Sequence, residues 1–199
     1  MEPSAAAYPA TFTFDPPEKV TNWRPLVNWL LAIPHFAVLY ALRILAQVIA
    51  VISWFVILFT GDMPDTFANL QAMWMRYEQR VYTFATFMRE EYPPFAFATT
   101  TADDGQDPRT RVDVQPVLTD RDRLSVGLRI FYVIPHVVCL IGLGIYAAIL
   151  VLINFFIVLF TGEWNAGMRD TVIKVQRWYV RVSAYFLLLT DEYPPFTLD

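Results

Sequence analysis

Apolar residues gather in two long runs along this chain and set the expected architecture. The run at 36–59 contains only Arg43 and Gln47 as strongly polar side chains, and the run at 137–160 contains no charged residue. Each run has 24 residues, which exceeds the roughly 20 that a helix needs to cross about 30 Å of hydrocarbon. The pattern predicts two membrane-spanning helices, at about 26–60 and 127–161.

Shorter elements surround these helices. The segments ATFTFD and RVDVQP, which start at Ala10 and Arg111, alternate apolar and polar residues as a strand does. A second helix is expected after each long one, at about 65–89 and 168–190. It follows a Thr-Gly pair suited to ending a helix and stops before a Tyr-Pro-Pro that cannot continue one. We therefore expect an all-α membrane protein of two helical hairpins, with four main helices and a strand-like segment before each hairpin.

The two halves of the chain are copies of one unit. A shift of 101 residues aligns 33–95 with 134–196 without a gap, and 21 of the 63 positions are identical. Both copies contain Ile-Pro-His, Phe-Thr-Gly and Glu-Tyr-Pro-Pro-Phe. Tandem duplication is a common origin of pseudo-symmetric membrane proteins. We assign 1–98 to the first repeat, 99–111 to a polar, flexible linker and 112–199 to the second repeat.

The orientation of the second helices has two interpretations. Each carries charges on one face, and a charge at the bilayer centre costs roughly 2.5–3.5 kcal/mol, which about cancels the apolar gain. The connections at 60–64 and 161–167 lack Lys and Arg, whereas the N-terminal segment and the linker region contain them. The positive-inside rule then favours two membrane-spanning hairpins with the termini and linker in the cytoplasm. The alternative places the second helices in the interface as amphipathic elements.

Composition agrees with a membrane protein. Hydrophobic residues make up 56% of the chain and charged residues 17%, compared with about 25% charged residues in soluble domains. The net charge of −4 excludes the broad basic surface that nucleic-acid binding requires. The expected partners are the lipid bilayer and a membrane protein or a second copy of this chain, with no nucleic acid.

Two histidines occupy equivalent places in the repeats. His35 and His136 each follow the Ile-Pro pair at the start of a long helix. Two imidazoles related by pseudo-symmetry could ligate a b-type haem. The alternative is that each histidine hydrogen-bonds to backbone or to lipid head groups, so that no cofactor is bound.

Other polar residues are assigned structural or interaction roles. An arginine inside an apolar helix is a functional or pairing residue, unless it lies near one end and extends to the interface. Glu91 and Glu192 could pair with Arg181 and Arg80 of the opposite repeat, or the Glu-Tyr-Pro-Pro-Phe motif could be only a helix stop and interface anchor. The assigned set is Arg43, Gln47, Arg76, Arg80, Glu91, Tyr92, Arg177, Arg181, Glu192 and Tyr193.

The repeated Phe-Thr-Gly and Glu-Tyr-Pro-Pro-Phe motifs carry a resemblance to a known family. The chain resembles a bacterial family of small membrane proteins of unknown function, often actinobacterial and often in tandem, over about 26–95 and 123–196. The resemblance implies a location in the bacterial plasma membrane as a multi-pass protein and implies no activity. The first repeat departs from the pattern at Asn28, where the second has the more usual Arg129.

The chain lacks the sequence signatures of common catalytic sites. It has no Cys/His cluster with metal-ligand spacing, no phosphate-binding glycine loop and no nucleophile with a neighbouring histidine. We expect a non-enzymatic integral membrane protein, a structural or accessory subunit of a larger membrane complex. The alternatives are a haem- or quinone-binding electron-transfer subunit, a lipid-binding membrane protein, and a small transporter with a polar cavity between the hairpins near Arg43 and Gln47.

Overall fold

Each repeat contributes one strand and three helices to the fold. The structure is a computed structural model that describes residues 8–199, so the first seven residues assigned to the first repeat lie outside the described part. The first repeat contains β1 (Ala10–Phe14), α1 (Arg24–Leu31), α2 (Ile33–Thr60) and α3 (Asp65–Ala85). The second repeat contains β2 (Thr110–Val114), α4 (Arg123–Tyr132), α5 (Ile134–Thr161) and α6 (Ala166–Phe186).

The two predicted long helices are each divided by a break. α1 and α2 are separated at Ala32, and α4 and α5 at Val133, directly before the two Ile-Pro-His motifs. Proline has no N–H to donate to the preceding turn, and its ring crowds the carbonyl four residues back. The described residues therefore form six helices, where the sequence predicts four main ones.

The predicted helix ends after α2 and α5 are confirmed. Gly61 and Gly162 have φ angles of 85° and 73°, in the left-handed region that only glycine enters at little cost. The carbonyl of Gly162 accepts a 2.8 Å hydrogen bond from the backbone N–H of Val20, and the carbonyl of Gly61 accepts one of 2.9 Å from Arg121. Each glycine thus ends a helix of one repeat and joins it to the other.

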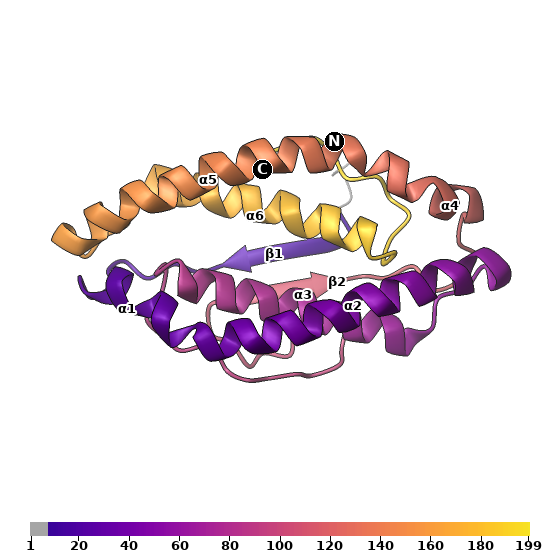
Figure 1. Cartoon of the computed structure of the whole chain (residues 1–199), viewed down its shortest axis with the longest axis horizontal. Helices are drawn as coiled ribbons and strands as arrows, with labels where there is room; N and C mark the ends of the chain where they lie inside the picture. The colour runs from indigo at the N-terminus through magenta and orange to yellow at the C-terminus, as the bar shows by residue number, and fades with distance from the viewer. Residues whose placement is uncertain (1–7) are drawn as a thin grey trace, which may run out of the picture.

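The strand-like segments form one antiparallel pair across the repeats. The register runs from Ala10 opposite Val114 to Phe14 opposite Thr110. β1 of the first repeat packs on α6 of the second, and β2 of the second packs on α3 of the first. In Figure 1 the strands lie in the middle, with α2 and α3 on one side and α5 and α6 on the other. The repeats are therefore interlocked through exchanged strands.

The linker is held in place, contrary to the flexible and solvated segment that its composition predicts. The side chains of Asp103 and Asp104 are only 9% and 6% exposed and lie beside Arg76 and Arg80 of α3. A carboxylate is removed from water only where a cation or strong donors replace the water. The arginines of α3 provide that replacement, so the linker forms part of the fold.

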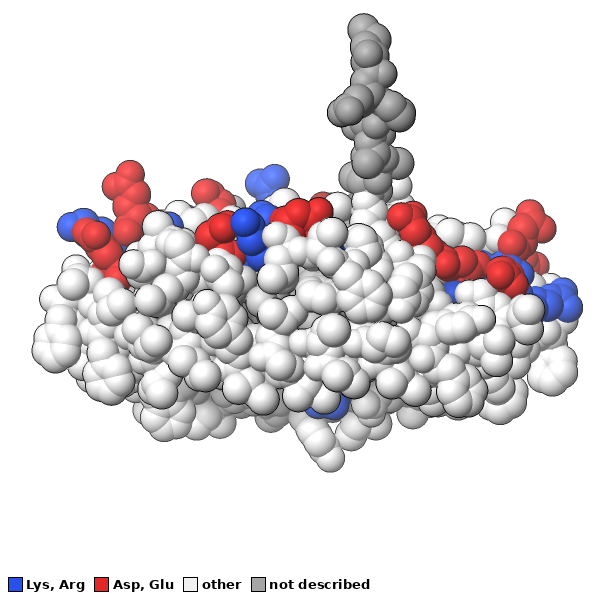
Figure 2. All heavy atoms as spheres, turned by 90° about the horizontal axis from the view of Figure 1, so that it is seen from above, with Lys and Arg blue, Asp and Glu red and all other residues white. Residues whose placement is uncertain are grey.

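Polarity is segregated between two broad faces. α3 and α6 are largely buried, whereas the apolar windows of α2 and of the α4–α5 segment (Ile33–Thr60 and Arg123–Thr161) are only 22% buried. Both segments are long and apolar enough to cross a membrane. α2 and α5 lie in front of α3 and α6 in Figure 1. Figure 2 shows most of the charged side chains along the opposite long face, with one basic side chain visible on the apolar face.

Candidate functional site

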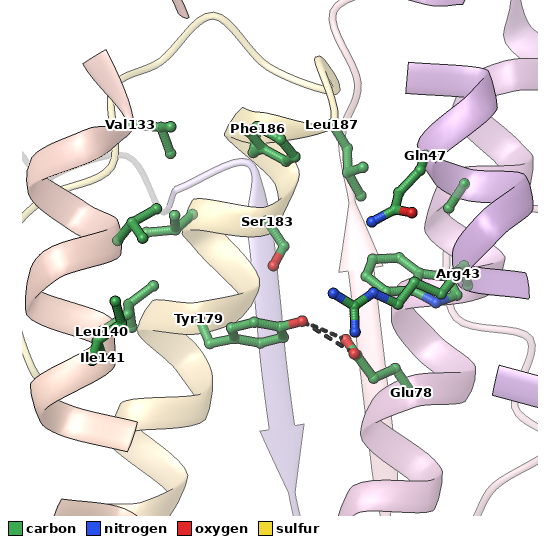
Figure 3. A pocket seen from close by; sticks show the side chains of 14 residues that line it. Arg43, Gln47, Glu78, Val133, Leu140, Ile141, Tyr179, Ser183, Phe186 and Leu187 are labelled. Carbon is green, nitrogen blue, oxygen red and sulfur yellow. Dashed lines mark hydrogen bonds between the residues drawn. The ribbon is translucent and has the colours of Figure 1, made fainter. Parts of the chain in front are cut away.

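A cavity of about 480 Å³ lies between the repeats. α2 contributes Arg43 and Gln47, α3 contributes Glu78, and α6 contributes Tyr179 and Ser183. The remaining lining is mostly apolar and comes from α2, α3, α5 and α6 and from single residues next to α5 and α6. Figure 3 shows the polar side chains directed toward one another across the space between the helices. The transporter alternative predicts a polar cavity near Arg43 and Gln47. The cavity found here includes both residues, but most of its lining is apolar, and transport stays a prediction.

Glu78 and Tyr179 connect the two repeats at this cavity. The Tyr179 hydroxyl donates to the Glu78 carboxylate, with distances of 3.1 Å and 2.9 Å to its two oxygens. Burial raises the pKa of Glu78 to about 7, although the Tyr179 hydrogen bond and the charge of Arg43 act in the opposite direction. The cavity therefore holds a carboxyl group that titrates near neutral pH.

Arg43 has no acidic partner in the described part of the chain. Within residues 8–199 its guanidinium forms neither a hydrogen bond nor an ion pair within 4.0 Å, although Glu78 is close enough to feel its charge. Arg43 and Gln47 are both exposed. A second cavity, of about 350 Å³, shares Gln47 and Phe186 with the first and is otherwise lined by apolar residues and Arg129.

The structure does not bring the two histidines together. His35 stacks on Phe95, with ring centroids 4.2 Å apart, and its Nδ1 lies 2.6 Å from the Tyr77 hydroxyl. His136 stacks in the same way on Phe196 at 4.0 Å. Each ring lies in a cluster within its own repeat, and α2 and α5 begin at opposite ends of the molecule (Figure 1). This placement offers no shared haem site between them.

The Ile-Pro-His and Glu-Tyr-Pro-Pro-Phe motifs form one structural unit in each repeat. The Tyr92 hydroxyl donates to the carbonyl of Leu31 at 3.3 Å, and the Tyr193 hydroxyl donates to the carbonyl of Tyr132 at 3.1 Å. These carbonyls lie at the breaks where proline interrupts the helical hydrogen bonds. The tyrosine supplies a replacement donor there, which explains why both motifs occur in both repeats.

The ion pairs proposed between opposite repeats are wrong. Arg80 binds Asp104 of the linker, and Arg181 pairs with Asp199 at 2.7 Å. Glu91 pairs with Arg109 at 2.7 Å. The Glu-Tyr-Pro-Pro-Phe segments leave the helix ends and pack back on their own repeats, so their carboxylates do not reach the opposite arginines.

The other two assigned arginines also bind backbone carbonyls. Arg76 donates to the carbonyl of Thr100 at 2.9 Å, and Arg177 donates through Nε to the carbonyl of Phe12 at 3.3 Å. The carbonyl of Glu192 accepts a 3.0 Å hydrogen bond from the Tyr8 hydroxyl. These contacts therefore hold the linker to α3, β1 to α6, and the C-terminal segment to the residue Tyr8 that precedes β1.

Asn28 and Arg129 perform the same task in spite of the sequence departure. Asn28 donates to the carbonyls of Phe84 and Arg89 at 2.9 Å and 3.0 Å. The Arg129 guanidinium binds the two equivalent carbonyls of the second repeat, at 3.0 Å and 2.8 Å. Arg129 also shares the Asp191 carboxylate with Arg121, each at 2.6 Å.

A fully buried ion pair was missed by the sequence analysis. The Arg89 guanidinium donates to both oxygens of Asp107, at 2.7 Å and 2.6 Å, and both side chains are 0% exposed. The equivalent position in the second repeat is Thr190. That mismatch between the repeats is a usable signal, because the partner of Arg89 lies in the linker, outside the alignment of the two repeats.

Comparison with known families agrees with the duplicated architecture. The family described as Domain of unknown function (DUF4389) matches residues 22–96 and again residues 123–197. The chain belongs to this family. Its membership confirms the resemblance to a tandem-repeat family of unknown function, while the bacterial distribution stays a prediction. No curated protein and no solved structure matches the chain significantly.

Proposed function

We propose that this DUF4389 protein is embedded in one leaflet of a membrane, with α2 and α5 parallel to the bilayer plane. The apolar side chains of these helices are too numerous and contiguous for a face in water, where large exposed patches mark interaction surfaces. Many of the large ones are 40% or more exposed, including Tyr40, Val51, Phe59, Ile145 and Phe160. A bilayer covers such a surface without a protein partner.

The single observation that carries the orientation is a set of contacts at the helix ends. The crossing-hairpin prediction places the connections at 60–64 and 161–167 on the opposite side of the membrane from the cation-bearing segments. In the structure these regions touch. The carbonyl of Thr60 accepts a 3.0 Å hydrogen bond from Arg123, and Lys19 pairs with Glu163 at 2.8 Å.

These contacts leave no room for a bilayer between the segments they join. The charged face also runs parallel to the long helices (Figures 1 and 2), whereas helices that cross a membrane need their polar ends at its two surfaces. An in-plane arrangement places the apolar face in hydrocarbon and the charged face toward water. It thereby replaces the two crossing hairpins of the sequence prediction.

Labelling of sealed, oriented membrane vesicles tests this arrangement. In a Cys139→Ser background, Asp62→Cys and Arg111→Cys each place one thiol on an exposed position, in the first connection and in β2. The in-plane arrangement predicts that an impermeant maleimide labels both thiols from the same side. Labelling from opposite sides would restore the crossing hairpins. A protein that stays in the soluble fraction as an oligomer would contradict membrane embedding itself.

The biological role that we propose is structural or accessory within a membrane complex of the bacterial plasma membrane. The charged face is the side that such a partner would contact, since the apolar face is occupied by lipid. Purification in mild detergent, followed by an absorbance spectrum and mass spectrometry, tests the role. A colourless protein with a stoichiometric membrane partner supports it, and a Soret band at one haem per chain would contradict it.

A further inference from the structure

The cavity between the repeats combines a free cation with an apolar surrounding. Arg43 is the single charged residue of α2, and in the described residues it lacks an ion pair within 4.0 Å. Figure 3 shows its guanidinium directed toward the cavity beside Gln47. A guanidinium at an apolar surface is costly unless an anion or strong acceptors replace its water.

Glu78 meets this need only in part. Its carboxylate already accepts the Tyr179 hydroxyl at 2.9 Å, and burial raises its pKa to about 7. A carboxyl group whose pKa is raised this far is readily protonated, and it then offers Arg43 no negative charge. In that state the cavity carries the positive charge of Arg43 without compensation and has room for an anionic group.

The geometry points to a binding site for one anionic membrane lipid, with its phosphate head group at Arg43 and Gln47 in the larger cavity. Guanidinium groups bind phosphate through paired N–H donors. The cavity volume of about 480 Å³ lies in the range of about 300–1,000 Å³ that is usual for small-molecule sites. This inference rests on the proposed membrane embedding, which brings lipid to the cavity.

The adjoining cavity fits the acyl chain of the same lipid. It shares Gln47 and Phe186 with the larger one and is lined by apolar side chains, among them Val51, Trp54 and Ile130. Its one charged lining residue, Arg129, already binds Asp191 and two backbone carbonyls. A chain leaving the head-group site therefore finds an apolar path beside α2.

Native mass spectrometry of the detergent-purified full chain tests the site with phosphatidylglycerol as the probe and phosphatidylcholine as the uncharged comparison. We expect one phosphatidylglycerol per chain and at least tenfold weaker binding of phosphatidylcholine. Arg43→Gln should weaken phosphatidylglycerol binding at least tenfold. Arg43→Lys, which keeps the charge but loses the paired guanidinium donors, should weaken it by less than Arg43→Gln does. Lys174→Gln is the matched control, because it removes one partly exposed cation of α6 outside the cavity.

Three results would overturn the inference. They are equal binding of the two lipids, unchanged binding by Arg43→Gln, and displacement of phosphatidylglycerol by inorganic phosphate at equal concentration. The last result would indicate a site for a soluble anion instead of a lipid. Vesicle flotation of the same proteins separates this outcome from failure of the proposed function. A protein that floats with phosphatidylcholine vesicles but shows no lipid preference retains the membrane embedding and loses only the lipid site.

Discussion

Breaking the buried pair between Arg89 and Asp107 should be among the most damaging single changes to this fold. Asp107 accepts two hydrogen bonds from Arg89 and two more from the backbone N–H groups of Arg109 and Thr110, at 3.0 Å and 2.8 Å. In Asp107→Asn the amide oxygen can still accept from the backbone, but the Arg89 charge is left buried and unpaired. Such a loss costs about 3–5 kcal/mol.

The assay is thermal unfolding in a mild detergent, followed by circular dichroism. For a chain of this length about 1 kcal/mol corresponds to about 2–4 °C, so Asp107→Asn should lower the unfolding midpoint by about 6–20 °C. Glu91→Gln is the matched control, because it breaks the 2.7 Å pair with Arg109 while the Glu91 side chain is 41% exposed. Exposed pairs contribute about 0–1 kcal/mol. A shift for Asp107→Asn no larger than that of the control would refute the reasoning.

A double substitution separates the ion pair from local backbone effects. Arg89→Met removes the cation that Asp107→Asn leaves unpaired. If the pair is the cause, the double variant should lose less stability than the sum of the two single variants, with a coupling of about 0.5–3 kcal/mol. Strictly additive losses would place the damage in the separate contacts of each residue.

Three further predictions concern the helix ends and pH. Gly162→Ala should lower the unfolding midpoint more than Gly105→Ala does. Both glycines have a positive φ, but only at Gly162 would an added Cβ lie against a backbone oxygen, at 2.9 Å. Equal shifts would argue against the close contact. Tyr193→Phe should cost about 0.5–1.5 kcal/mol and speed amide exchange at the α4–α5 break, and unchanged exchange would count against the capping role. Burial acts to raise the pKa of Asp191, but its two arginine partners outweigh burial and lower it overall. The stabilisation from ionised Asp191 is fully present above the pKa of the unfolded state, about 3.9, and is lost as pH falls through the lower pKa of the folded state. Asp191→Asn should therefore flatten the acid side of a plot of unfolding midpoint against pH. Parallel plots for the variant and the unaltered protein would contradict this.

Local chemistry made the elements of one repeat predictable. Gly61 and Gly162 end their helices because of a backbone conformation that the Thr-Gly sequence already indicates. The alternation in the two short segments correctly predicted β1 and β2. An alternation of apolar and polar residues does not identify the partner of a strand. The exchange of strands between the repeats could therefore be seen only in the structure.

The incorrect predictions concern ion pairs and topology, which depend on contacts between residues far apart in the sequence. Pseudo-symmetry suggested that arginines of α3 and α6 pair with glutamates of the opposite repeat. Arg80 instead forms an ion pair with Asp104 of the linker, which lies outside the alignment of the repeats. The hairpin topology assumed that polar connections lie across a membrane from the cations, whereas the Thr60 carbonyl accepts directly from Arg123. The special status of Arg43 and Gln47 could be predicted, because polar residues within an apolar run are exceptional, whereas the mostly apolar lining of their cavity could not.

The depth of α5 in a bilayer tests the in-plane arrangement most directly. Val138, Ile145 and Leu152 are spaced by seven residues and are 64%, 60% and 60% exposed, so spin labels at these positions share one helix face. With Cys139 replaced by serine, relaxation by oxygen and by a polar nickel chelate in lipid vesicles reports the depth of each label. The in-plane arrangement predicts nearly equal depths for all three. A helix that crosses the bilayer would place the middle label about 10 Å deeper than the outer two, from a rise of about 1.5 Å per residue, and that profile would contradict the account.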